Sequence, residues 1–123
     1  MKTAIRFSLI GLLGVLLLVS CVHTNISLST PAFRTLPDGA YLGNFDGGIV
    51  KATVLVHMVE GVLQKIDIVT HECGLGKPAE KIVDTVVAKQ SLDVDTIAGA
   101  TYSSRVILKA TEIALDTALA SYK

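Results

Sequence analysis

The chain has 123 residues with 11 basic and 11 acidic side chains, and half of its residues are hydrophobic. A chain of this length suits one small domain, and without a basic excess it lacks the electrostatic footprint of a nucleic-acid-binding protein. Two cysteines are too few for a disulfide framework, so stability has to come from a packed apolar core.

The N-terminal segment is typical of an export signal. MKTAIRFSLIGLLGVLLLVS carries two bases and no acid, and its apolar run from Leu9 to Val19 is short for a membrane span. The run ends in the stretch LVSC, which resembles the lipobox of bacterial lipoproteins. We therefore expect residues 1–20 to be removed and Cys21 to be lipidated, which anchors the protein to a membrane on its extracytoplasmic side, either the cell surface or the periplasm. An ordinary secreted protein with an unmodified Cys21 is the alternative.

Removal of this segment leaves 9 bases against 11 acids, a net charge of about −2. Residues 21–37 then include VHTNISLSTPAFRTL, which is polar, rich in Ser and Thr and without sustained periodicity. This composition predicts a lipidated tether that holds the domain off the membrane. The domain itself is expected over residues 38–123.

The first half of the domain has the period of β-strands. A short strand is expected over residues 40–44, followed by a turn in DGG at 46–48. Alternate residues from Val50 to Met58 are apolar, which predicts a strand with one buried face. The turn residues Glu60-Gly61 and the β-branched run from Leu63 to Thr70 complete a predicted hairpin.

From residue 77 the period changes to that of helices. Apolar residues at helical spacing predict an amphipathic helix over Lys77–Gln90. A second helix is expected to run nearly to the C-terminus, with Ser103 or Ser104 as its N-cap. Strands followed by segregated helices predict a two-layer α+β domain, a small antiparallel sheet with two helices packed on it.

The loop DTIAGATYSS, residues 95–104, precedes the second helix. Gly99 and Ala100 are small, so a bulky group can approach the backbone closely. Thr101 stands just before the helix, where unpaired N–H groups and the positive dipole favour a phosphate. A phosphate on the Thr101 hydroxyl would lie against these donors, with the Ser103 and Ser104 hydroxyls in reach. The spacing alone leaves open that Thr101 and the serines only cap the helix.

The stretch DTIAGATYSSRVILKATEIAL resembles the signature of the FMN-binding domain family, which includes the flavoprotein subunits of the sodium-translocating NADH:quinone reductase and Rnf complexes and many small stand-alone lipoproteins. DGAYLGNFDGGIVKATVLV is similar to the opening hairpin of the family, and HECGLGKPAEKIVDTVVAKQSLDVD to its middle section. The likeness therefore spans about Asp38 to Leu115, with the small stand-alone members as the closest match.

The family pattern is Asp-x-x-Ser/Thr-Gly-Ala-Thr-x-Ser/Thr-Ser, in which the threonine after Gly-Ala carries FMN through a phosphoester. The resemblance implies covalent FMN on Thr101. It also implies a separate magnesium-dependent flavin transferase that uses FAD, releases AMP and recognises Asp95 and Gly99-Ala100-Thr101. Ala98 departs from the pattern, since Ser or Thr is usual there. The missing hydroxyl is not the acceptor, so the departure bears on the efficiency of modification and on one contact near the phosphate.

A second candidate stretch is Gly74-Leu75-Gly76. The corresponding stretch of the family lies beside the flavin, so the resemblance implies that these residues support the isoalloxazine through their backbone N–H groups. A plain strand-to-helix turn would use the same residues. Lys77 could favour a reduced, anionic flavin or be solvated surface, and Tyr102 could stack on the ring or cover the core.

His71 and Cys73 do not complete the four-ligand set of a structural zinc site, so no metal is predicted. Cys73 also has no second cysteine to resolve it as a redox nucleophile, and we expect a small, buried or half-buried residue.

Together these features predict an extracytoplasmic lipoprotein that carries one FMN and exchanges electrons with an unidentified redox partner. The sequence has no convincing acid/base pair or substrate-pocket signature, which favours a carrier over an autonomous enzyme. Three alternatives stay open: a flavin-dependent reductase acting on a quinone or an extracellular acceptor, a protein with non-covalent FMN, and a flavin-free binding or structural lipoprotein of the envelope in which Ala98 reflects lost modification.

Overall fold

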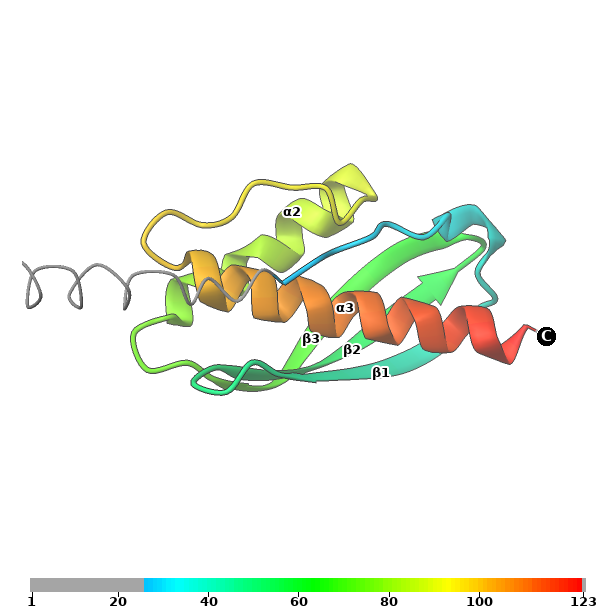
Figure 1. Ribbon diagram of the computed structural model, residues 1–123. Coiled ribbons are helices and arrows are strands. Elements are labelled where there is room, and N and C mark those ends of the chain that lie inside the picture. The colour runs from blue at the N-terminus through cyan, green and yellow to red at the C-terminus, as the bar shows by residue number, and fades with distance from the viewer. Residues whose placement is uncertain (1–25, 123) are drawn as a thin grey trace, which may run out of the picture.

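The computed structural model describes residues 26–122, so the predicted signal and Cys21 lie outside the described residues. A three-stranded antiparallel sheet in the order β1-β2-β3 carries helices on one face (Figure 1). The strands are β1 (Gly39–Asp46), β2 (Lys51–Val59) and β3 (Val62–Glu72), and the helical elements are η1 (Phe33–Thr35), η2 (Lys77–Lys81), α2 (Ile82–Lys89) and α3 (Thr101–Ser121). This arrangement confirms the predicted α+β fold class.

The central strand β2 shows the predicted alternation. Its inward residues Ala52, Val54, Val56 and Met58 are almost completely buried, and they form the sheet side of the core. The predicted turn at Glu60-Gly61 is confirmed, because both residues have positive φ angles, +52° and +71°, between the paired residues Val59 and Val62. Positive φ at both central positions suits the right-handed twist of a two-residue hairpin.

Helix α3 lies against β1 at backbone distance. A Cβ atom added to Gly43 would stand 1.9 Å from the Ala110 carbonyl oxygen, so only glycine allows this approach. The inward face of α3 completes the core with Val106, Ile107, Ala110, Ala114 and Leu115, all essentially inaccessible to solvent. Burial of this apolar face contributes most of the stability of such a helix.

The helix boundaries differ from the predicted ones. The segment predicted as one helix, Lys77–Gln90, begins as the 3₁₀ turn η2 and continues as α2, and Gln90 ends it with a φ of +52°. The Gln90 side chain accepts a hydrogen bond from Leu63 N–H at 2.9 Å and donates one to Leu63 O at 2.8 Å, which fastens the end of α2 to β3. Within residues 26–122, no helix has the length and apolar character needed to cross a membrane.

The described part of the segment predicted as a tether packs against the domain. The Phe33 and Leu36 side chains are buried in the core. Figure 1 shows this segment, in blue, starting over the N-terminal half of α3 and running to η1 near the opposite end of the domain. The boundary at residue 38 stays a prediction.

Two polar contacts hold this segment on α3. The Ser29 hydroxyl donates to Glu112 Oε1 at 2.7 Å, and Lys109 Nζ donates to the Ser27 carbonyl at 3.0 Å and to Glu112 Oε2 at 3.0 Å. Burial raises the pKa of Glu112, but the hydrogen bonds from Ser29 and Lys109, together with the Lys109 charge, lower it by more, so the pKa lies below that of an ordinary glutamate. The ionised carboxylate therefore stabilises this packing.

Candidate functional site

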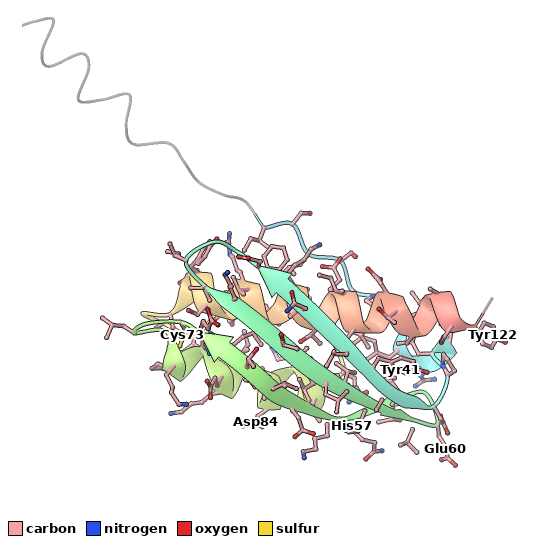
Figure 2. The ribbon with its side chains drawn as sticks, turned by 90° about the horizontal axis from the view of Figure 1, so that it is seen from below. Tyr41, His57, Glu60, Cys73, Asp84 and Tyr122 are labelled. Atoms are coloured by element: carbon pink, nitrogen blue, oxygen red, sulfur yellow. The ribbon has the colours of Figure 1, made fainter. Side chains whose placement is uncertain are left out.

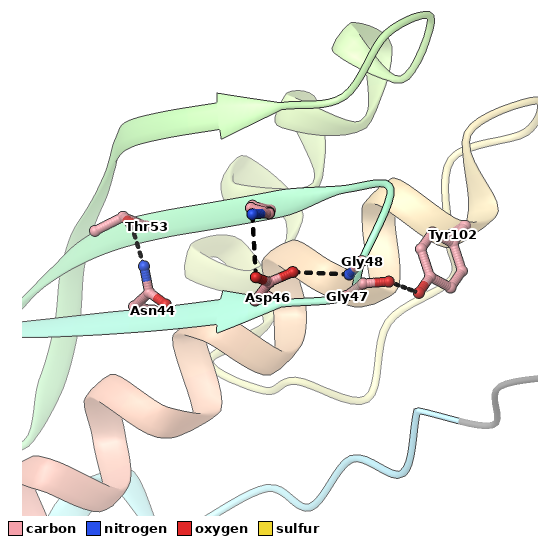
Figure 3. A network of polar contacts seen from close by, with 7 residues as sticks. Asn44, Asp46, Gly47, Gly48, Thr53 and Tyr102 are labelled. Carbon is pink, nitrogen blue, oxygen red and sulfur yellow. Dashed lines mark hydrogen bonds and ion pairs between the residues drawn. The ribbon is translucent and has the colours of Figure 1, made fainter.

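The predicted site segments meet at one end of the domain. The register pairs Asp46 with Lys51 and Lys51 with Glu72. The β1–β2 turn and the loop after β3 therefore leave the sheet at the same end of the strands. The loop before α3 reaches the same end (Figure 1). The Tyr102 hydroxyl, on the first turn of α3, donates a hydrogen bond to the Gly47 carbonyl of the β1–β2 turn (Figure 3). Sheet and helix are therefore tied together beside Thr101.

The β1–β2 turn is organised by Asp46. Its carboxylate accepts a hydrogen bond from Gly48 N–H at 2.8 Å and pairs with Lys51 Nζ at 3.2 Å, and these contacts lower the Asp46 pKa (Figure 3). Gly47 N–H donates to the Val50 carbonyl at 2.9 Å and closes the turn. The bond from Tyr102 gives that side chain a positioning role at this turn. Tyr102 is also half-buried and packs against the core, as one of its two predicted roles requires, whereas stacking on the flavin stays a prediction.

The loop before α3 is a tight turn over residues 97–100. Ala100 N–H donates to the Ile97 carbonyl at 3.0 Å, and Gly99 has a φ of +78°, which a side chain would strain. Ala98 occupies the position before Gly99 and is exposed. A hydroxyl at position 98 would therefore point to solvent or a ligand, and its absence leaves the turn geometry intact.

The Ser104 side chain, on the first turn of α3, fixes this loop by hydrogen bonds. Its hydroxyl accepts a hydrogen bond from Ile97 N–H at 3.0 Å and donates one to the Ala100 carbonyl at 2.8 Å, and the residue is completely buried. The prediction that Ser103 or Ser104 is the N-cap is wrong, since α3 begins at Thr101 with Ala100 as N-cap. The Ser104 hydroxyl, expected to reach a phosphate, is instead used inside the protein, because the helix begins earlier than predicted and turns this side chain inward.

The first turn of α3 presents free donors next to an exposed Thr101. No side chain caps this helix, and the bond from Ser104 N–H to the Ala100 carbonyl, 2.9 Å, is the first of its ladder. The N–H groups of Thr101, Tyr102 and Ser103 therefore have no partner within the helix. The first turn also contains no acidic residue. Such a turn favours an anion close to the Thr101 hydroxyl.

The Gly74–Gly76 loop packs against this same turn. A Cβ atom on Gly76 would stand 1.9 Å from Ser103 Oγ and 2.7 Å from Ser103 Cβ, so the glycine backbone lies directly on the serine. Gly76 N–H closes the loop on the Cys73 carbonyl at 2.7 Å, and Gly74 has a φ of +51°. Sequence reasoning predicted close approach of a flavin here. In the structure the close neighbour of Gly76 is Ser103. This contact joins two segments far apart in the sequence, so no local sequence pattern predicts it.

The other predicted residues surround this point at the surface. The Leu75 side chain is 97% exposed at the tip of its loop. Lys77 is also exposed, with Nζ 3.7 Å from Glu80 Oε1, and Asp95 is exposed in the loop before the turn. Their accessibility leaves them open to a ligand, and their roles toward a flavin stay predictions.

His71 is buried beneath the loop. Its side chain is 1% exposed, with Nδ1 3.1 Å from Glu80 Oε1, while Nε2 has no hydrogen-bond partner among the described residues. The contact connects the end of β3 to η2, with the His71 side chain buried and the Glu80 side chain 30% exposed. Residues 26–122 contain no group of three or more His, Cys, Asp or Glu that could hold a metal ion. Cys73 is half-buried, as predicted, and its thiol is free.

Two recesses flank the N-terminal half of α3. One, of about 460 Å³, is lined by Ile26, Phe45, Gly47 and Tyr102 among others, and one of about 480 Å³ lies between Ile26, Leu92, Val94 and Arg105. Leu92 is buried. A larger recess of about 770 Å³ lies at the opposite end, between η1 and the β2–β3 turn, and none of the predicted site residues lines it.

The comparisons with known proteins agree with this placement. Residues 47–116 match the family model of the FMN-binding domain. This range starts in the β1–β2 turn and includes the Gly74–Gly76 loop, the turn at 97–100 and most of α3. Searches of curated proteins and of solved structures gave no significant match. Because the family model covers more than half of the chain, the protein belongs to the FMN-binding domain family.

Proposed function

We propose that this protein carries FMN covalently through a phosphoester on Thr101 and acts as an electron carrier. The observation that supports this most is the exposed Thr101 hydroxyl on a helix turn whose three leading N–H groups have no helical partner and no side-chain cap. An ester phosphate on this oxygen would lie within reach of those donors. Capping alone does not account for the turn, because no Ser or Thr side chain caps it.

The residues around Thr101 fit the rest of the group. The Gly74–Gly76 loop is fixed against Ser103 and offers backbone donors to a flat ring. Ser104 holds the turn at 97–100 so that Thr101 points outward, and Tyr102 fixes the neighbouring hairpin turn. Bound there, the flavin would supply one- or two-electron transfer, while the protein sets its position and surroundings.

The attachment follows the chemistry that the family resemblance implies. In that chemistry the Thr101 oxygen would form a bond to the phosphorus of the FMN half of FAD, while the pyrophosphate bond would break, AMP would leave and the hydroxyl proton would pass to solvent. A flavin transferase is therefore a required partner. Position 98 is three residues before the acceptor and is not part of the bond, so modification proceeds without a hydroxyl there, at a lower rate.

The carrier is proposed to work outside the cytoplasm, attached to a membrane through lipid on Cys21. This location gives the covalent bond its physical reason, because a dissociable cofactor would be lost by dilution outside the cell. Its redox partner is unidentified.

The test is expression of the full chain with a flavin transferase, followed by intact mass and in-gel flavin fluorescence. We expect one FMN per chain and fluorescence that survives denaturation. Thr101→Val should abolish both, whereas Thr96→Val, a half-buried threonine in the same loop, should retain them. Flavin released on denaturation would show non-covalent binding, and a colourless protein would show a flavin-free lipoprotein; either result overturns the covalent proposal.

A further inference from the structure

We propose that the domain rests on the lipid bilayer with the end that carries Thr101, and that Ile49 and Leu75 contact the membrane interface. This inference rests on the proposed lipidation of Cys21 and adds an orientation that the proposed function leaves open. It contrasts with a tether that holds the domain away from the membrane.

The first observation is the place where the described chain begins. Ile26 lines the recess beside Gly47 and Tyr102, and Ser27 is held by Lys109 on α3. Cys21 precedes Ile26 by five residues, and five residues span at most about 18 Å. A lipid on Cys21 therefore attaches close to the first turns of α3.

The packing of the N-terminal segment on the domain is what creates this constraint. Had the chain left the domain at η1, its exit would lie toward the opposite end of α3, which has 21 residues and is about 31 Å long. The contact from Ser29 to Glu112 instead keeps the segment on the helix and returns the chain toward the Thr101 end.

The second observation is a pair of exposed aliphatic side chains at this end. Ile49 in the β1–β2 turn is 87% exposed, and Leu75 in the loop after β3 is 97% exposed. The strand register places these two loops at the same end of the sheet. Figure 2 shows Cys73, two residues before Leu75, at the end of the domain opposite Glu60 and Tyr122. Side chains of this kind gain free energy by leaving water for a bilayer interface.

The charge at this end favours an apolar contact over binding to anionic lipid. Exposed Lys51 and Lys77 stand beside exposed Asp46, Glu72 and Asp95, so neither sign dominates. Asp46 and Lys51 also pair with each other. A bilayer of zwitterionic phosphatidylcholine should therefore be sufficient.

The experiment uses the lipidated full-length protein in phosphatidylcholine vesicles that contain doxyl-labelled lipid as a fluorescence quencher. In a Cys73→Ser background, an environment-sensitive fluorophore is attached at Ile49→Cys or at Val62→Cys, an exposed aliphatic position at the other hairpin turn. We expect quenching at position 49 to exceed that at position 62 by at least about threefold, because the two turns flank opposite ends of β2 and lipid quenching is short-ranged. Equal quenching, or stronger quenching at position 62, overturns the proposed orientation.

The membrane contact itself is tested by a second substitution in the Ile49→Cys background. Leu75→Asp should lower quenching at position 49 at least twofold, whereas Val69→Asp, a 55% exposed residue on β3, should leave it unchanged. Equal effects of the two substitutions would overturn the contact at Leu75.

The outcome is independent of flavin attachment. The Thr101→Val protein should show the same quenching pattern, so a failed flavin proposal leaves the orientation standing. A chain that is not recovered with membranes refutes lipidation and overturns the orientation as well.

Discussion

Gly76→Ala tests whether the contact between the Gly74–Gly76 loop and α3 positions the site. The new Cβ would stand 1.9 Å from Ser103 Oγ, although ordinary contacts begin near 3.4 Å, so the loop and helix must separate by about 1.5 Å or rearrange. Overpacking of this kind costs about 1–3 kcal/mol. Gly76 has a φ of −81°, which alanine accepts, and the lower entropy of the unfolded alanine chain returns about 0.4–1 kcal/mol. We expect a net loss of about 1–2 kcal/mol in the free energy of unfolding and slower flavin attachment to Thr101.

Urea unfolding and the rate of flavin attachment measure the two effects. Gly74→Ala is the matched control: a Cβ there meets nothing within 4 Å, but the φ of +51° strains it, so it should destabilise without any coupling to Ser103. Ser103→Gly removes the two closest atoms that the new Cβ would meet and leaves the Cys73 carbonyl oxygen at 3.1 Å. In combination with Gly76→Ala it should restore at least about 1 kcal/mol, whereas a coupling energy within about 0.5 kcal/mol of zero would refute the contact.

Three further predictions follow from the loop, the buried carboxylate and the departure from the family pattern. Ser104→Ala should cost about 1–3 kcal/mol of unfolding free energy, since it leaves the Ile97 N–H without its acceptor, and should slow flavin attachment. Thr111→Val removes a similar buried hydroxyl bond about two turns further along α3 and should leave the attachment rate unchanged. Because the pKa of Glu112 is depressed in the folded state, the ionised carboxylate stabilises the protein fully above about pH 4.3, and this stabilisation is lost as the pH falls through the folded pKa. Glu112→Gln should therefore make the free energy of unfolding decline less steeply in acid. An unchanged slope of that free energy against pH would contradict the depressed pKa. Ala98→Ser should raise the attachment rate at unchanged stability, since position 98 is exposed; a rate equal to that of the native protein would show that this hydroxyl has no role.

Periodicity predicted the parts of the fold that rest on one repeated burial pattern. The alternation from Val50 to Met58 defined the buried face of β2, and the helical spacing in the C-terminal segment identified α3. Gly43 could not be interpreted in this way, because its need for glycine comes from the Ala110 carbonyl of a helix far along the chain. Phe33 and Leu36 were missed because two apolar residues in a polar stretch give no period, although both are buried.

The site shows the same division between local and long-range information. The motif placed Thr101 just before a helix, and in the structure Thr101 is the first residue of α3. The approximate position was predictable because small residues, a turn and a helix start are local features. The N-cap prediction failed because a serine hydroxyl can bond either to the first free N–H groups or back to the preceding turn, and tertiary burial of Ser104 selects the second. The contact of Gly76 with Ser103 joins two loops that only the folded sheet brings together.

The most direct test of the central claim is the location of the FMN phosphoester within the loop. Cleavage after Lys89 and Arg105 releases residues 90–105, whose hydroxyl-bearing residues are Ser91, Thr96, Thr101, Tyr102, Ser103 and Ser104. Fragmentation of this peptide from the protein expressed with a flavin transferase should place the flavin phosphate on Thr101 alone. An adduct on another hydroxyl of the peptide, or an unmodified peptide from a protein that still binds FMN, would contradict the account.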